Sequence, residues 1–309
     1  MSKTIFAVNY EIPGYSNTYL DITSKCSLMD ADIILFDPDF VYRYDTNING
    51  ENKYRGKLLY NESGSFDLKE DSEHWKKEIS NALKNSKTVF LLLNKKESFY
   101  IDTGTRSYSG TGKNRKTTIN VNQGTNYDFL PIDIGKITSV SGKSIVFSGE
   151  SLFQPLYNQF KKYFEYSVYL EDILEATVLF TGKDGSKILG AIFSFNNGHL
   201  VALPYIFFSP DKYIEYKENE DGEEIEVWNE DALILGKHLT KILLDIDKNL
   251  KQESAKTPKP IWVSNKNYCI GDELKISEDI NNHKNKIMKI KEKINILEKK
   301  LNEEIKLKD

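Results

Sequence analysis

Two short runs of consecutive apolar residues constrain the fold of this chain more than any other feature. Residues 33–36 read IILF and residues 88–93 read TVFLLL. Strands that are apolar on both faces are typical of the centre of a parallel sheet, which is covered on both sides. Between the two runs, the apolar residues that fall on one face of a helix are Leu68, Trp75, Ile79, Ala82 and Leu83. This order of strand, helix and strand predicts a βαβ unit and an α/β protein.

The rest of the sequence adds further strands and helices to this unit. Asp-Gly at 184–185 and Asn-Gly at 197–198 are typical of two-residue hairpin turns, and they separate three strand-like runs. The expected elements are a strand at 3–10, a short helix at 23–30, a β-rich insertion at 95–150, a helix at 152–164, strands at 176–180, 188–195 and 199–203, an exposed acidic loop at 211–226 and a helix at 229–250. We therefore expect a mostly parallel sheet that carries an antiparallel insertion and hairpins.

Composition places the protein among cytoplasmic globular proteins. Of the 309 residues 39% are hydrophobic, which is enough for a core, and no apolar run approaches the roughly 18 residues of a membrane span. The N-terminal residues lack the pattern of a signal peptide. Cys26 and Cys269 are the only cysteines, which excludes a disulfide framework and a cysteine-based zinc site. We expect a cytoplasmic protein with no membrane contact.

Charge is unevenly distributed along the chain. The net charge is −4, yet residues 281–309 hold nine Lys against five acidic residues, so the rest carries about −8. An acidic body disfavours extensive nucleic-acid binding, but a local basic patch remains. Arg106, Lys113, Arg115 and Lys116 cluster with Tyr108 in a Gly- and Ser-rich loop. Cations beside an aromatic ring can bind a phosphate backbone, so these four residues are candidates for weak polyanion binding; the alternative is a solvated hairpin tip.

Known catalytic motifs are incomplete in this sequence. Gly142-Lys143-Ser144 and Gly112-Lys113 lack the other residues of a phosphate loop, and Gly149-Glu150-Ser151 lacks the second glycine of a nucleophile elbow. His199 is expected to be a polar strand residue and Cys26 a small buried or half-buried one. Asp211, Glu215 and Lys217 resemble part of a nuclease core, but they lie too close together in sequence to surround one metal ion. We expect no catalytic residue, metal site or cofactor among these motifs.

Asp37 and Asp39 are the more promising acidic residues. They follow the apolar run at 33–36, and ligands in open α/β sheets bind beyond the carboxyl ends of the strands. Together with Glu62 they form a candidate ligand site. The alternative is that these carboxylates are solvated loop residues.

Three segments resemble the class I glutamine-amidotransferase-like superfamily, in its non-catalytic branch. They are residues 30–36 (DADIILF), the helix and strand between Leu68 and Leu93, and the segments 177–180 (TVLF) and 198–204 (GHLVALP). The resemblance covers residues 1–206 and implies a flavodoxin-like sheet. The enzymes of this superfamily carry a Cys between glycines and a late His and acid. This sequence has no Gly-x-Cys-x-Gly, and no acid lies two residues after His199. The resemblance therefore implies a domain without amidotransferase activity.

The last part of the chain has the pattern of a coiled coil. Residues 257–275 include Thr257-Pro258-Lys259-Pro260 and are predicted to form a linker after a globular domain at 1–256. From residue 276 to 309, apolar residues recur at alternating spacings of four and three, which predicts a supercoiled helix. The predicted interface residues are Ile280, Ile287, Ile290, Ile294, Leu297 and Leu301. Such a helix binds a second copy or a partner protein, or it folds back onto the body.

Two functional hypotheses follow from these observations. The preferred one is a non-catalytic recognition or scaffold module of a multi-component bacterial system, in a host-defence or DNA-linked setting, that assembles through the coiled coil. The rival is a metal-dependent hydrolase or nuclease that uses Asp37, Asp39 and Glu62.

Overall fold

A computed structural model describes residues 4–256 of the chain, except for 41–42, 45, 47–52, 132–133, 143, 174–175, 196–197 and 220–222. The chain divides into two units, Met1–Lys259 and Pro260–Asp309, and the described residues belong to the first. The predicted linker and coiled coil, together with Cys269, lie outside the described residues.

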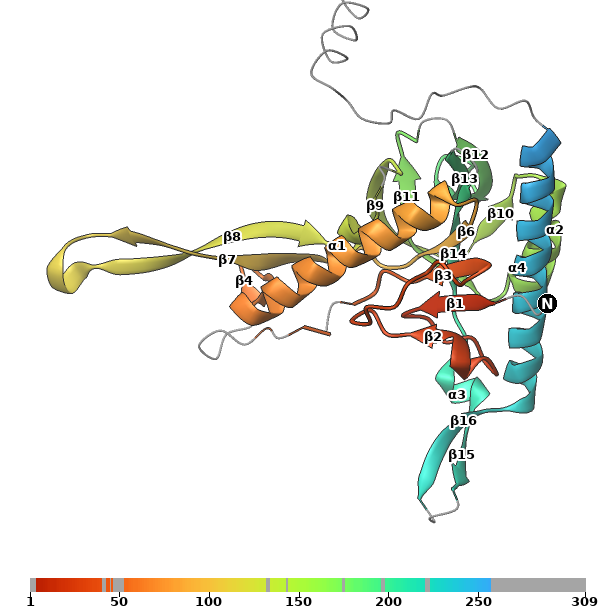
Figure 1. Ribbon diagram of the computed structural model, residues 1–309, viewed down its shortest axis with the longest axis horizontal. Coiled ribbons are helices and arrows are strands. Elements are labelled where there is room, and N and C mark those ends of the chain that lie inside the picture. The colour runs from red at the N-terminus through yellow and green to blue at the C-terminus, as the bar shows by residue number, and fades with distance from the viewer. Residues whose placement is uncertain are drawn as a thin grey trace, which may run out of the picture. The chain divides into compact units, whose positions relative to one another are not determined.

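A ten-stranded sheet organises the first unit (Figure 1). Its parallel part has the order β2-β1-β3-β6-β14, and β14 then continues into the antiparallel part. The parallel strands are β1 (Ile5–Val8), β2 (Tyr19–Leu20), β3 (Ile33–Phe36), β6 (Thr88–Leu93) and β14 (Gly198–Ile206). The antiparallel strands are β9 (Lys136–Gly142), β10 (Ile145–Phe147), β11 (Phe164–Glu171), β12 (Ala176–Gly182) and β13 (Ile188–Phe195).

The balance between parallel and antiparallel strands differs from the expectation. Among the described residues, four strand pairings of this sheet are parallel and six are antiparallel, so a mostly parallel sheet is wrong. Part of the cause is the 95–150 segment. Its strands β9 and β10 pair with β11 and β12 inside the main sheet, whereas its first part belongs to a separate sheet. The fold is mixed α/β.

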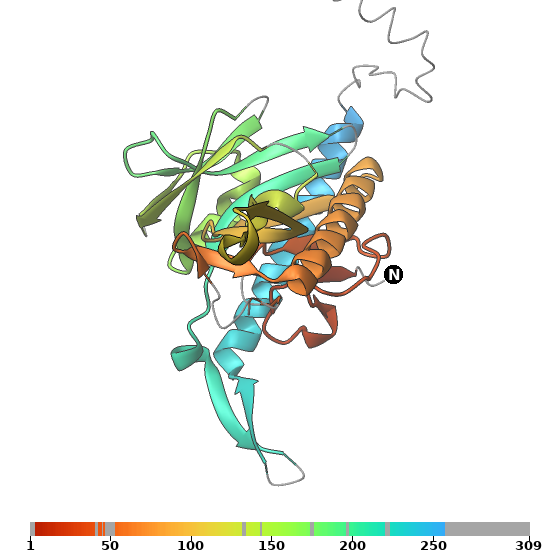
Figure 2. The same cartoon turned by 90° about the vertical axis from the view of Figure 1, so that its left-hand side faces the viewer.

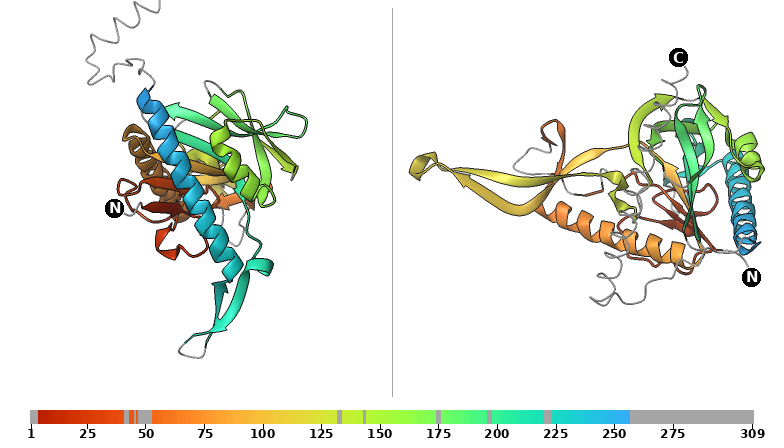
Figure 3. Two further views of the ribbon diagram at one scale, coloured as in Figure 1. Left: turned by 90° about the vertical axis from the view of Figure 1, so that its right-hand side faces the viewer. Right: turned by 90° about the horizontal axis from the view of Figure 1, so that it is seen from above.

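Helices cover both faces of the sheet (Figure 3). The helices are α1 (Glu62–Lys84), α2 (Gln154–Phe160), α3 (Pro210–Tyr213) and α4 (Glu230–Lys256). Alternate residues of each central strand enter different cores. Leu35, Phe90 and Val201 pack with α2 and α4, whereas Ile34, Leu91 and Leu200 pack with α1. The strands are therefore buried on both faces, which is the physical reason for their continuous apolar sequence.

Side-chain caps fix where the two long helices begin. The Asn61 side chain accepts a hydrogen bond from the Gly64 backbone N–H at 2.7 Å and caps α1. Asn229 caps α4 in the same way, through the Ala232 N–H at 3.0 Å, and Glu230 and Asp231 in the first turn suit the helix dipole. Both helices were predicted from their apolar periodicity, and both are confirmed.

A second, four-stranded sheet with the order β4-β5-β7-β8 carries a long hairpin. Its strands are β4 (Lys53–Tyr54), β5 (Lys57–Tyr60), β7 (Ser98–Ser109) and β8 (Lys116–Thr125). The outer part of the hairpin, from the Asp102–Val121 pair to its tip, extends away from the main sheet (Figure 1). We call residues 103–120 the arm.

Three local expectations are wrong. Residues 23–30 form turns rather than a helix, because the Asp21 carboxylate accepts hydrogen bonds from the Thr23 N–H and hydroxyl, both at 2.9 Å. The aromatic helix ends at Phe160, and Phe164 already begins β11. The acidic loop at 211–226 contains a hairpin of β15 (Ile214–Glu218) and β16 (Glu224–Trp228), which leads into α4 (Figure 2).

No helix within the described residues is long and apolar enough to cross a membrane.

Candidate functional site

Three polar residues meet at one edge of the main sheet. Asn9, Asp37 and Asn94 directly follow β1, β3 and β6, and parallel strands bring their carboxyl ends to the same edge. The chain crosses from β1 to β2 on one side of this point and from β3 to β6 on the other. Ligands of open α/β sheets bind at such a change of direction. We call these three residues the strand-end cluster.

Hydrogen bonds hold the strand-end cluster together. The Asn94 amide donates to Asp37 Oδ1 at 3.1 Å, and the Asp39 backbone N–H donates to the same oxygen at 3.0 Å. Asn9 adopts a left-handed backbone conformation with φ of 56°, and its side-chain amide donates to the Asp39 carbonyl oxygen. The Tyr127 hydroxyl donates to the Asn94 carbonyl at 2.5 Å. The cluster thus fixes the loop after β3 against its two neighbouring strands.

Burial changes the acidity of the carboxyl group at the centre of the cluster. Asp37 is only 3% exposed, and this burial raises its pKa to about 7, although the Asn94 and Asp39 hydrogen bonds oppose the change. Burial also raises the pKa of Tyr10, of Tyr127 and of Tyr205, and the nearby Asp37 carboxylate adds to each effect. Asp37 therefore changes charge near neutral pH, and the surrounding phenols stay protonated.

The structure does not assemble the predicted trio of carboxylates. Asp39 is exposed and neighbours Asp37, but Glu62 lies at the base of the arm, where its carboxylate is 3.6 Å from the Arg106 guanidinium. Within the described part of the chain, no group of three or more His, Cys, Asp or Glu side chains could hold a metal ion. The structure therefore does not support the metal site of Glu62, Asp37 and Asp39 that the sequence-based hypothesis required.

Asn9 and Asn94 were missed from the sequence. The rule that selected Asp37, a polar residue directly after a buried strand, applies equally to both of them. Tyr127 carried no such signal, because it reaches the cluster from η3, the short 3₁₀ helix Asn126–Phe129, about 30 residues later than β6.

The base of the arm is an ion-paired joint. Arg106 forms two parallel hydrogen bonds with Asp102, at 2.8 Å to Oδ1 and 2.9 Å to Oδ2. The Asp102 side chain is 1% exposed, and the register of β7 against β8 shifts between Asp102 and Arg106. Arg106 therefore neutralises a buried carboxylate, and only three of the four predicted polyanion-binding cations remain available.

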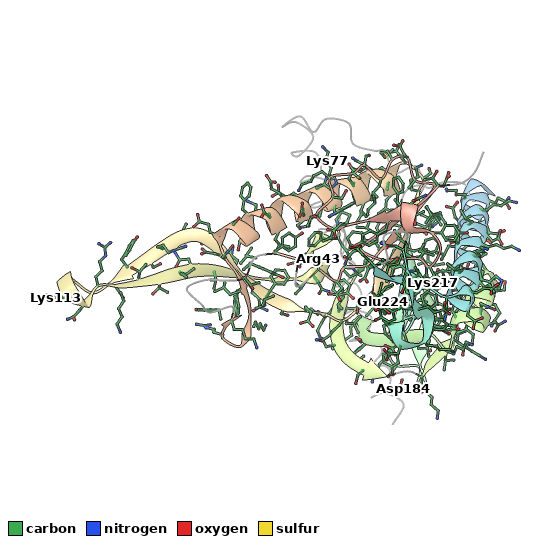
Figure 4. The ribbon with its side chains drawn as sticks, turned by 90° about the horizontal axis from the view of Figure 1, so that it is seen from below. Arg43, Lys77, Lys113, Asp184, Lys217 and Glu224 are labelled. Carbon is green, nitrogen blue, oxygen red and sulfur yellow. The ribbon has the colours of Figure 1, made fainter. Side chains whose placement is uncertain are left out.

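Those three cations lie around the tip of the arm. Lys113 occupies the far end of the hairpin (Figure 4), Lys116 begins β8, and both are exposed. The Arg115 guanidinium lies over the Tyr108 ring, with its central carbon 4.1 Å from the ring centroid. The arm contains four Lys or Arg residues and no Asp or Glu. It is thus a strongly basic element of an acidic chain.

The other residues considered from the sequence have structural surroundings. His199 lies in β14 as predicted, is 7% exposed, and contacts Ser194 Oγ through Nδ1 at 3.3 Å. Burial lowers the pKa of its imidazole, and the negative charge of Asp247 partly opposes this effect. Cys26 is exposed, contrary to expectation, and lies in the turns at 23–30. Glu215 and Lys217 lie on β15, and the Lys217 ammonium is 3.7 Å from the Glu215 carboxylate.

No family model, curated protein or solved structure matches this chain.

Proposed function

We propose that this protein is a non-catalytic recognition module whose arm binds nucleic acid, as one component of a bacterial multi-protein system. The observation that carries the proposal is the arm itself. Three exposed cations gather at the end of the arm, which has no acidic residue, on a chain of net charge −4. In an acidic protein, a basic element held away from the body is suited to a polyanionic partner that the body repels.

The dimensions of the arm favour a duplex. From the Asp102–Val121 pair to the Ser109–Lys116 pair, β8 advances five residues, which is about 17 Å at about 3.3 Å per residue. A two-stranded β-ribbon fits the major groove of a duplex. One face of the Tyr108 ring is covered by Arg115, so stacking of this ring on an unpaired base competes with that contact. The stack also orients the guanidinium, whose N–H groups can bind a phosphate or a guanine edge.

The fold supports a flavodoxin-like relationship as part of this proposal. Numbered in chain order, the five parallel strands follow 2-1-3-4-5, which is the flavodoxin-like order. This order agrees with the resemblance to non-catalytic glutamine-amidotransferase-like domains, which implies a domain that recognises rather than transforms. Assembly through residues 276–309, and a host-defence or DNA-linked setting, belong to the same proposal.

The salt dependence of binding tests the role of the arm. A labelled 20-base-pair duplex, titrated with the full chain between about 50 and 200 mM salt, should give a linear dependence of log K on log salt. Replacing Lys113, Arg115 and Lys116 together by Ala should reduce the slope by about 2.7, since each phosphate contact contributes about 0.9.

A matched variant separates local contacts from net charge. Lys237, Lys241 and Lys248 are exposed on α4, and replacing them by Ala removes the same three charges. We expect this variant to bind like the parent protein. Equal losses in the two variants, or a parent protein that does not bind at 50 mM salt, would contradict the proposal. Tighter binding of an unpaired strand than of the duplex would contradict the duplex assignment.

A further inference from the structure

An aromatic pocket lies beside the strand-end cluster, at the carboxyl ends of β1 and β14 and next to the last residue of β16. Its volume is about 160 Å³. It is lined by Asn9, Tyr10, Glu11, Tyr205, Ile206, Phe207, Phe208 and Trp228. Five of these eight residues are aromatic, and the only charged one is a carboxylate.

The rings meet at several angles. Tyr10 and Tyr205 are perpendicular, with centroids 6.0 Å apart, and Phe207 stacks on Tyr205 at 6.5 Å with 29° between the planes. The Tyr10 hydroxyl donates to the Ile206 carbonyl at 2.7 Å, which ties the loop after β1 to the end of β14. The pocket wall is thus a rigid aromatic corner. The face of each aromatic ring carries a partial negative charge.

Glu11 supplies the full charge. Its Oε1 accepts a hydrogen bond from the Trp228 indole at 2.7 Å, so the carboxylate and the indole ring are held next to each other. Asp37 and Asp39 lie close enough to the pocket for their charges to act on Tyr205. No Lys or Arg is among the residues that line the pocket. The charges that these residues bring to the pocket are therefore negative.

We propose that this pocket binds an organic cation, an alkylammonium or guanidinium group, with the positive charge between the aromatic rings and the Glu11 carboxylate. Aromatic rings combined with a carboxylate recognise such cations through cation–π attraction and ion pairing. The small volume suits one cationic headgroup. The cation comes either from a free amine or from a Lys or Arg side chain of another protein. The site is independent of the arm, which is basic and binds anions.

The first experiment compares a cation with its uncharged counterpart. Choline and 3,3-dimethyl-1-butanol have nearly the same shape, but only choline is charged. Titrated into the full chain by calorimetry, choline should bind at least about tenfold more tightly, the ratio for about 1.4 kcal/mol of cation–π and charge attraction. Agmatine and an arginine-containing peptide are titrated in parallel. Tighter binding of the peptide identifies a protein side chain as the source, and tighter binding of agmatine a free amine.

Substitutions assign the binding to this pocket. Glu11→Gln removes the charge but keeps an oxygen that can accept the Trp228 hydrogen bond, and it should weaken cation binding about tenfold. Trp228→Leu should weaken it by a similar factor. Glu226 is exposed on β16 and does not line the pocket, so Glu226→Gln should bind like the parent protein. Equal binding of the alcohol and choline, equal weakening by both Glu→Gln variants, or no binding of any cation at millimolar concentration would overturn the proposal.

Discussion

Asp37 couples the strand-end cluster to pH. Its pKa of about 7 lies above the ordinary 3.8 because the folded protein buries the carboxyl group. Between pH 4 and pH 7 the unfolded chain loses this proton while the folded chain keeps it. The folded state is therefore favoured less as pH rises through this range, and the loss is complete above the folded pKa. Taken over the whole range, the effect amounts to at most about 4 kcal/mol.

Asp37→Asn should remove this pH dependence. The amide keeps the size of the side chain and an oxygen that can accept from Asn94 and Asp39, but it never ionises. We expect the variant to be more stable than the parent at pH 8, and the difference to shrink as pH falls to 4. Urea unfolding at several pH values measures this difference in the free energy of unfolding. The control is Asp67→Asn at an exposed position, which should leave the pH dependence of stability unchanged. A variant that is less stable at pH 8 would show that the charged form of Asp37 is required.

At the level of elements, Gly236 marks a close approach between α4 and the loop after β1. A Cβ atom at Gly236 would lie 1.9 Å from the Pro13 carbonyl oxygen, in the loop after β1. At a solvent-exposed position in a helix, Gly→Ala stabilises the folded protein by about 1 kcal/mol. At Gly236 the Cβ atom would clash with backbone atoms, which cannot change rotamer as a side chain can. Overpacking of this kind costs about 1–3 kcal/mol or more.

Gly236→Ala should therefore destabilise the protein, opposite in sign to helix propensity. Chemical denaturation should give a lower free energy of unfolding, and the exposed Lys241→Ala on the same helix should change it by less than about 0.5 kcal/mol. Stabilisation by Gly236→Ala would mean that α4 does not pack against the Pro13 loop.

The elements that the sequence predicted are those that burial defines. β3 and β6 are buried on both faces, so their residues are uniformly apolar, and α1 and α4 each place an apolar stripe on one core. Asp37 was identified because its position follows directly from the end of β3. At these positions the local sequence pattern reflects burial in the folded protein, so a single sequence is sufficient to predict the elements.

Where long-range contacts decide, the sequence was insufficient. The turns at 23–30 are held by Glu78 of α1, which accepts from the Leu28 N–H at 2.8 Å and the Ser27 hydroxyl at 3.0 Å. β13 is apolar on both faces although both its hairpin neighbours are antiparallel, so composition could not distinguish strand direction. Glu62 was grouped with Asp37 by proximity in sequence alone. Its ion-pair partner, Arg106, is 44 residues later in the sequence and lies in the arm.

For the whole molecule, the decisive question is what residues 276–309 bind. They lie outside the described residues, so the coiled coil remains a prediction from the spacing of Ile280, Ile287, Ile290, Ile294, Leu297 and Leu301. Most of the stability of a helix in a protein comes from burial of its apolar face, so the apolar stripe of this helix is expected to be buried against a partner. If two copies pair, the resulting dimer presents two arms, one from each copy, to a duplex. Binding of the second arm then becomes intramolecular, and affinity rises without a new contact.

Ile287→Asp combined with Ile294→Asp places two charges in the predicted coiled-coil interface, the seam between the two helices, and should abolish self-association or partner binding. Analytical ultracentrifugation of the full chain measures the mass, and circular dichroism should show an intact globular part. Asn285→Asp with Lys289→Asp also introduces two Asp residues, but at positions outside the seam, and should leave association unchanged.

If pairing supplies two arms, the seam variant should also lose affinity for a long duplex while a short duplex binds as before, because only the long one can engage both arms. A monomeric parent protein that purifies without a partner would instead mean that the helix folds back onto its own body.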